Sequence, residues 1–224
     1  MSTPTVMIIR HGEKPVDDKH VGSSSYQGID LLGQSADPPG GSASLIPQGW
    51  MRCGALGRFF VPLAGTPLRA GISVPTQLFA ASAAEPCPAT FSHSNQQPPQ
   101  IVSVNGPTHS LREQELLLGV SALSQLAINA TYARGSDERQ LAEAVAALPD
   151  GSVALIAWEH NNIPKLAFHL DKALGAHVGS KIPSVWDGKR FDLVWVFAPS
   201  SSGYTFTQVP QMLLPGDNPE PLPV

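Results

Sequence analysis

Charged residues are scarce in this sequence, and neither sign of charge dominates. Lysine, arginine, aspartate and glutamate make up 14% of the 224 residues, and the formal net charge is −4. A protein that binds nucleic acid normally presents a basic face, so this balance argues against that class. A small basic pocket for an anion is still compatible with it, because a local cluster can oppose the net charge.

Cysteines and long apolar runs are also lacking. The two cysteines, Cys53 and Cys87, are too few for a disulfide scaffold and have no metal-ligand spacing, so we expect no metal site. No apolar run approaches the ~20 residues that cross a bilayer, so we expect no membrane contact. No basic segment followed by an apolar one marks a secretory signal near the N-terminus. We therefore expect a cytoplasmic protein with reduced thiols.

Glycine and proline, by contrast, are abundant, with 20 and 22 residues. This composition predicts long loops, which we place at residues 16–47 and 82–109, and a Pro-rich extended tail at 214–224. Hydrophobic residues make up 42% of the chain, as in ordinary soluble proteins. We expect residues 1–224 to form a single domain.

Short apolar strands alternate with amphipathic helices along the chain. Strands are predicted at 5–9, 76–81, 127–132 and 152–157, with a short one at 100–104 and a hairpin at 191–197 and 204–209. Helices are predicted at 47–60, 110–126, 136–147 and 161–174, with Ser110 and Glu113 as a capping box and Ser136 as a further cap. The alternation predicts a three-layer α/β/α sandwich with a mostly parallel sheet.

The first strand ends in Arg10-His11-Gly12. A histidine with a pKa near ~6.5 is largely neutral at physiological pH, and a neutral imidazole can attack phosphorus. An arginine beside it can hold phosphoryl oxygens through its planar fork of donors. Gly12 allows close approach of backbone and ligand because it has no Cβ. We therefore take His11 as a candidate nucleophile and Arg10 as its phosphate-binding partner.

Two further groups are expected at the same edge of the sheet. Glu159-His160 follows another buried strand, and Arg112 lies at the start of a helix, where anions are favoured. Functional residues of such sheets lie beyond the carboxyl ends of the strands. His160 and Arg112 are therefore expected to complete an electropositive phosphate pocket with His11 and Arg10.

These motifs, in this order, resemble the histidine phosphatase superfamily, the phosphoglycerate-mutase-like proteins. Arg10 to Glu13 matches the opening motif, and residues 45–52 resemble its Leu-Thr-x-x-Gly helix start, with Ile46 in place of threonine. Residues 79–82 resemble the second strand and its serine. Residues 110–112 resemble the segment with the second phosphate-binding arginine, displaced by an insertion, and residues 158–160 match the second catalytic histidine.

The resemblance implies a phosphoglycerate-mutase-like fold and a histidine acid-type phosphatase that needs no cofactor. His11 would be phosphorylated by a small phosphomonoester, and Arg10, Arg112 and His160 would hold the phosphoryl group. Asn161 follows His160, where many relatives have an aspartate as proton donor. The general acid is left open among the nearby carboxylates, which are Glu13, Glu113, Glu115 and Glu159.

Two other functions stay open. A phosphoglycerate-type mutase would return the phosphoryl group to a second hydroxyl, but it needs a strong substrate clamp, and the chain has only 14 lysines and arginines. A catalytically weak module that binds inorganic phosphate or a partner is favoured by the unassigned general acid. Among the remaining cations, Arg52 and Arg58 are expected to be solvated helix residues, and Lys14 a solvated loop charge.

Overall fold

The computed structural model describes residues 3–14, 28–29, 44–82, 89–90 and 110–224. These residues contain seven strands in one sheet, four α-helices and one 3₁₀ helix. The elements in chain order are β1 (Thr5–Arg10), α1 (Pro47–Phe60), β2 (Gln77–Ala81), β3 (Ala89–Thr90), α2 (Arg112–Ser124), β4 (Ile128–Tyr132), α3 (Glu138–Ala146), β5 (Val153–Trp158), α4 (Ile163–Leu174), η1 (Gly179–Lys181), β6 (Leu193–Ser200) and β7 (Gly203–Pro210).

The sheet is mixed, with a parallel centre. Its strand order is β3-β4-β2-β5-β1-β6-β7, and the four adjacent strands β4, β2, β5 and β1 are parallel. The predicted hairpin is confirmed as β6 and β7, which add antiparallel strands beside β1. The parallel register aligns Arg10 with Trp158, so the chain leaves β1 and β5 at the same edge of the sheet.

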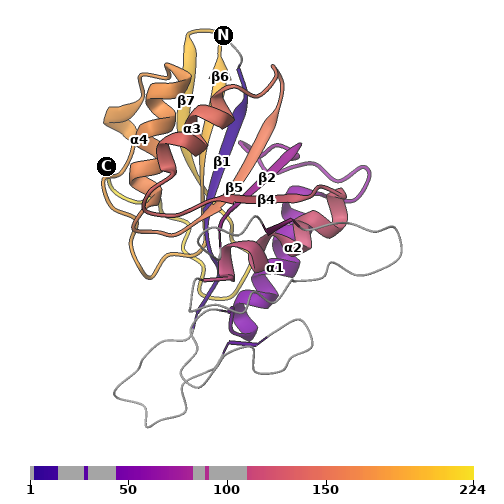
Figure 1. Cartoon of the computed structure of the whole chain (residues 1–224). Coiled ribbons are helices and arrows are strands. Elements are labelled where there is room, and N and C mark those ends of the chain that lie inside the picture. The colour runs from indigo at the N-terminus through magenta and orange to yellow at the C-terminus, as the bar shows by residue number, and fades with distance from the viewer. Residues whose placement is uncertain (1–2, 15–27, 30–43, 83–88, 91–109) are drawn as a thin grey trace.

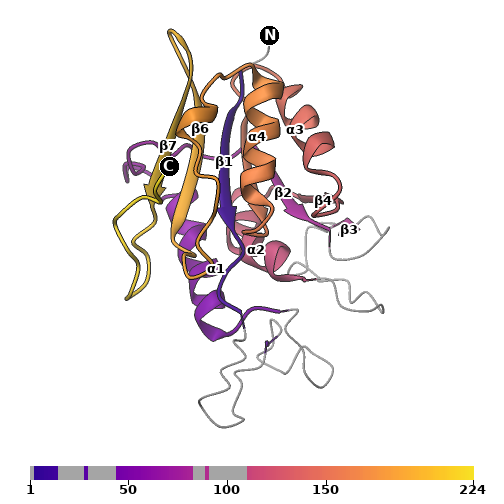
Figure 2. The same ribbon diagram turned by 90° about the vertical axis from the view of Figure 1, so that its left-hand side faces the viewer.

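Helices cover both faces of the sheet, as the three-layer arrangement requires (Figures 1 and 2). Side chains alternate along each buried strand: Val6 and Ile8 pack toward α3 and α4, whereas Met7 and Ile9 pack toward α1 and α2. All four are fully buried. Because both faces are covered, a strand such as β1 is apolar throughout rather than alternately polar.

All four predicted helices are present, with bounds that differ from the predictions by up to two residues. The bounds of α1 are those predicted, and α4 ends as expected at Gly175, a residue with φ of 60°. By contrast, α2, α3 and α4 each begin two residues later than predicted, and α2 also ends two residues earlier. Leu111 rather than Ser110 directly precedes α2, and the Ser110 hydroxyl bonds the backbone N–H and side chain of Arg112 as well as the Glu113 side chain. Asp137, rather than Ser136, is the residue before α3.

Helices α1 and α2 approach so closely that glycine is required at the contact. A Cβ on Gly119 would lie 2.3 Å from the carbonyl oxygen of Cys53. The Cys53 thiol is buried in this contact, bonding the Glu115 carbonyl, and burial raises its pKa to about 11. The thiol is therefore inert at neutral pH, in agreement with its predicted place on the apolar stripe of α1.

The C-terminal residues pack on the body of the protein. They form neither helix nor strand, as predicted, but Leu222 is buried and its backbone bonds the side chain of Gln208. Most of the loops predicted at 16–47 and 82–109, and the strand at 100–104, lie outside the described residues. Among the described helices, none is long and apolar enough to span a membrane.

Candidate active site

His11 lies directly after β1, at the edge of the sheet where β5 also ends. Its backbone N–H donates to the Trp158 carbonyl, which continues the pairing of the two strands by one residue. Its side-chain Nδ1 lies 2.8 Å from the Gly12 carbonyl oxygen. A carbonyl only accepts hydrogen bonds, so Nδ1 carries the proton and Nε2 carries the free electron pair. The local backbone therefore selects the tautomer that a nucleophile needs.

The surroundings of His11 keep its ring neutral. The side chain is almost fully buried, and burial together with Arg112 and Arg10 holds its pKa well below the ordinary value. The His160 ring lies edge-on to it with a centroid distance of 6.0 Å, and the Phe191 ring lies at 5.9 Å. The predicted meeting of His11 and His160 is thus confirmed. Phe191 was missed, because a hydrophobic residue before a strand has no functional signature.

Gly12 lies in a tight packing contact next to His11. A Cβ on Gly12 would lie 2.9 Å from a methyl group of Leu45 and 3.0 Å from one of Leu116. A Cβ on Gly49, near the start of α1, would lie 2.7 Å from the carbonyl oxygen of Glu13. The two glycines therefore let α1 pack directly against the chain that carries His11. This contact explains why glycine is needed both after His11 and near the start of α1.

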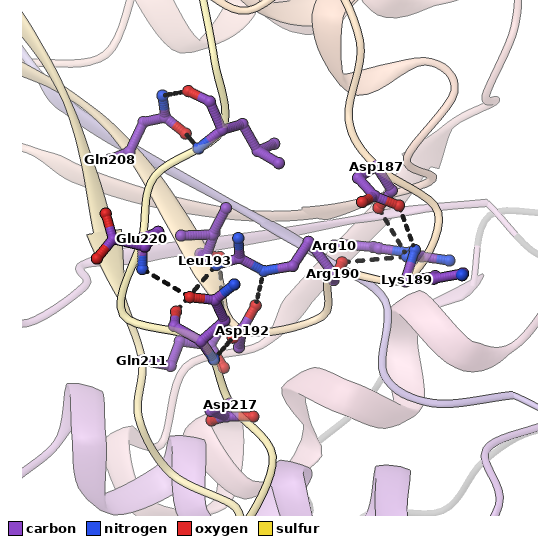
Figure 3. Close-up of polar contacts among 12 residues, drawn as sticks. Arg10, Asp187, Lys189, Arg190, Asp192, Leu193, Gln208, Gln211, Asp217 and Glu220 are labelled. Carbon is purple, nitrogen blue, oxygen red and sulfur yellow. Dashed lines mark hydrogen bonds and ion pairs between the residues drawn. The ribbon is translucent and has the colours of Figure 1, made fainter.

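Arg10 connects the end of β1 to the loop before β6. Its Nη1 donates to the carbonyl oxygen of Arg190 at 3.1 Å (Figure 3) and to that of Gly188 at 2.6 Å. Its guanidinium carbon lies 3.8 Å from the centre of the Phe191 ring. Burial lowers its pKa to about 10, so it stays charged at neutral pH. Its buried Nε has no hydrogen-bond partner among the described residues and could donate to an anion.

Arg112 is the first residue of α2 and is 7% exposed. Its Nε donates to Ser110 Oγ at 2.8 Å, and its buried Nη1 has no hydrogen-bond partner within the described part of the chain. Burial lowers its pKa, Glu113 opposes this effect and Arg134 adds to it. Leaving a charged N–H buried and unpaired is costly, so such a group indicates a site for an anion.

His160 lies against the carboxylate of Glu159, which follows β5. The His160 Nδ1 lies 2.8 Å from Glu159 Oε1, although the two atoms are not aligned as a hydrogen bond. The same carboxylate accepts hydrogen bonds from Asn161 and Asn162. Burial alone would raise the pKa of Glu159, but the contacts with these three residues lower it to about 2. Glu159 is therefore an ionised carboxylate beside the His160 ring, and it carries no proton to donate at neutral pH.

Glu13 lies close to His11 in sequence, but its side chain faces α1. Its carboxylate forms a buried ion pair with Arg52, whose Nη2 lies 2.7 Å from Glu13 Oε1. The same nitrogen lies 2.7 Å from Asp217 Oδ1, and Nη1 donates to Gln211. The prediction that Arg52 is solvated is wrong, since the residue is only 2% exposed. It is buried because three acceptors far apart in sequence converge on its guanidinium group.

The remaining carboxylates lie on α2. Glu113 is fully buried, accepts a hydrogen bond from Ser110 and lies 3.7 Å from Arg134. Burial raises its pKa. Glu115 is buried as well and accepts a hydrogen bond from the Leu45 backbone.

Contrary to the prediction that it is solvated, Lys14 is partly buried, and burial together with the charges of Arg112 and Arg10 lowers its pKa.

Four of the predicted residues therefore lie near one another: the His11 ring contacts that of His160, and the charges of Arg112 and Arg10 act on it. Across the described residues, no group of three or more histidine, cysteine or acidic side chains could hold a metal ion. A search with protein-family models gives no match to this chain, and a search of curated proteins gives no significant match. The resemblance to a family thus rests on the ordered motifs alone.

Proposed function

We propose that the protein hydrolyses small phosphomonoesters through a phosphohistidine on His11, as a member of the histidine phosphatase superfamily would. The supporting observation is a buried neutral imidazole with its tautomer fixed by Gly12, beside two arginines that keep N–H groups unpaired. A neutral nucleophile next to unpaired cationic donors is the arrangement that phosphoryl transfer needs.

The reaction has two steps. His11 Nε2 attacks phosphorus while the bond from phosphorus to the leaving oxygen breaks, and the leaving group takes a proton from solvent or an acid. Arg10, Arg112 and His160 stabilise the charge on the other phosphoryl oxygens. Water then attacks phosphorus, the bond from nitrogen to phosphorus breaks, and phosphate leaves with His11 neutral again. No step needs a metal or another cofactor.

A second candidate is a module that binds phosphate without turnover. It is favoured by the carboxylates of the described residues, because Glu13 is paired with Arg52 and Glu159 is held ionised. A phosphatase acting on alkyl esters needs a proton donor for the alkoxide, whereas a module that only binds phosphate needs none. No contact in the described residues specifically favours the mutase.

Hydrolysis of p-nitrophenyl phosphate separates these candidates, because nitrophenolate leaves without a proton donor. We expect turnover by the native protein and a loss of at least about 10³-fold in His11→Ala. His169→Ala, a histidine on α4 outside the pocket, serves as the matched control and should keep full activity. Phosphate binding without turnover would support the binding module, and equal turnover by native protein and His11→Ala would refute the proposed nucleophile.

A further inference from the structure

A buried chain of hydrogen bonds leads from Arg112 through Ser110 to Glu113. The Arg112 Nε donates to Ser110 Oγ at 2.8 Å, and the Ser110 hydroxyl donates to Glu113 Oε2, also at 2.8 Å. All three side chains are buried, with Glu113 fully enclosed. None of these contacts belongs to the phosphate chemistry itself, and neither Ser110 nor Glu113 was among the residues assigned to phosphate binding.

The chain has a direction that Ser110 imposes. A hydroxyl has one proton, and the Ser110 hydroxyl donates it in the hydrogen bond to Glu113. The lone pairs of the Ser110 oxygen therefore face Arg112. Arg112 thereby spends its Nε on a neutral acceptor and keeps Nη1 unpaired. A carboxylate bonded directly to Arg112 would instead form a bidentate pair and occupy two of its donors.

The second oxygen of Glu113 is also directed away from Arg112. Its Oε1 lies 3.7 Å from Nη1 of Arg134, a residue just beyond β4. Glu113 thus lies between two arginines, near Arg134 on one side and joined to Arg112 only through Ser110 on the other. Glu113 acts against the lowering of the Arg112 pKa by burial, and it does so without occupying the donors that an anion would use.

We infer that Ser110 and Glu113 are positioning residues that orient the Arg112 guanidinium, so that its Nη1 is presented to the phosphoryl group. This inference rests on the proposed function for the identity of the anion. It assigns to Ser110 and Glu113 no contact with substrate, and it predicts that both act only through Arg112.

The test measures two quantities, the affinity for inorganic phosphate by calorimetry and the kcat and KM for p-nitrophenyl phosphate. Ser110→Ala removes the acceptor of Arg112 Nε, and we expect phosphate affinity and kcat each to fall about tenfold. Glu113→Gln keeps an acceptor for the Ser110 hydroxyl and should lose less than Glu113→Leu. Ser121→Ala is the matched control, because Ser121 is a buried serine of α2 whose hydroxyl bonds the Leu126 carbonyl.

A double mutant separates positioning from simple loss of stability. If Ser110 acts through Arg112, then adding Ser110→Ala to Arg112→Met should change neither phosphate affinity nor kcat further. Full additivity, or an equal loss in Ser121→Ala, would overturn the inference. Native protein that binds phosphate without hydrolysing p-nitrophenyl phosphate would refute the phosphatase alone, and the affinities would still decide the role of Ser110. Native protein that binds no phosphate would overturn both.

Discussion

Arg52 and Arg112 are both buried at the carboxyl edge of the sheet, yet their surroundings are opposite. Arg52 is saturated, with Glu13 and Asp217 at 2.7 Å and an amide oxygen of Gln211 at 2.9 Å. Arg112 bonds one neutral hydroxyl and keeps a buried nitrogen unpaired. Burial of a charge is tolerated only when it is compensated. The first arginine is compensated by the protein itself, and we propose that the second is compensated by a phosphoryl group.

The largest expected effect is the loss of stability on replacing Arg52, the arginine whose donors are all paired within the protein. Arg52→Met would leave the buried carboxylates of Glu13 and Asp217 without a counter-charge, which costs about 3–5 kcal/mol of the free energy of unfolding. Urea unfolding followed by circular dichroism measures this loss. Arg58→Met is the matched control, because Arg58 is exposed on the same helix and should change stability by less than about 0.5 kcal/mol. Equal effects of the two substitutions would break the comparison.

The unpaired arginine should respond in the opposite way. Arg112→Met should lower kcat for p-nitrophenyl phosphate by about 10²–10³-fold, because it removes a donor to the transition state. Its free energy of unfolding should change by less than about 1 kcal/mol, because no ion pair closer than 4 Å is broken among the described residues. A large loss of stability with unchanged kinetics would make Arg112 a second structural arginine.

A smaller loss of stability is expected on replacing Asp217, the partner of Arg52 that is more distant in sequence. Burial would raise its pKa, but hydrogen bonds with Arg52 and the Leu214 and Leu213 backbone lower it below the ordinary 3.8. Asp217→Asn should cost about 1–3 kcal/mol of stability at pH 7. A lowered folded pKa stabilises the protein above the unfolded value and loses that effect as pH falls through the folded value. The gap between native protein and variant should therefore close below about pH 3.8, as acid titration of the unfolding free energy would show.

The smallest effect concerns the charge of His11. Because its pKa lies well below 6.5, the ring should stay neutral and protonated on Nδ1 at pH 6. Nitrogen-15 NMR distinguishes this tautomer from imidazolium, and the His11→Ala spectrum assigns the signal. An imidazolium signal at pH 6 would show that Arg10 and Arg112 do not act on His11 as described.

Local patterns predicted the parts of this molecule that depend on neighbours in sequence. Apolar β-branched runs identify β1 and β5, and strand ends placed His11 and His160 at one edge. The role of Arg52 was not predictable, because its partners Glu13, Gln211 and Asp217 are separated from it by up to 165 residues. The contacts of Arg10 with Phe191 and with the loop before β6 were not predictable either, because these residues are also far from Arg10 in sequence. The start of α2 was misplaced by two residues because Leu111, and not Ser110, directly precedes the helix.

The central claim is that His11 accepts the phosphoryl group, and trapping the intermediate tests it most directly. The native protein would be mixed with p-nitrophenyl phosphate, quenched in alkali, digested and mapped by mass spectrometry. We predict a phosphoryl group on His11 that is lost in acid and absent in His11→Ala, together with a burst of nitrophenolate. Turnover with no phosphorylated His11, or with the phosphoryl group on another residue, would contradict the account.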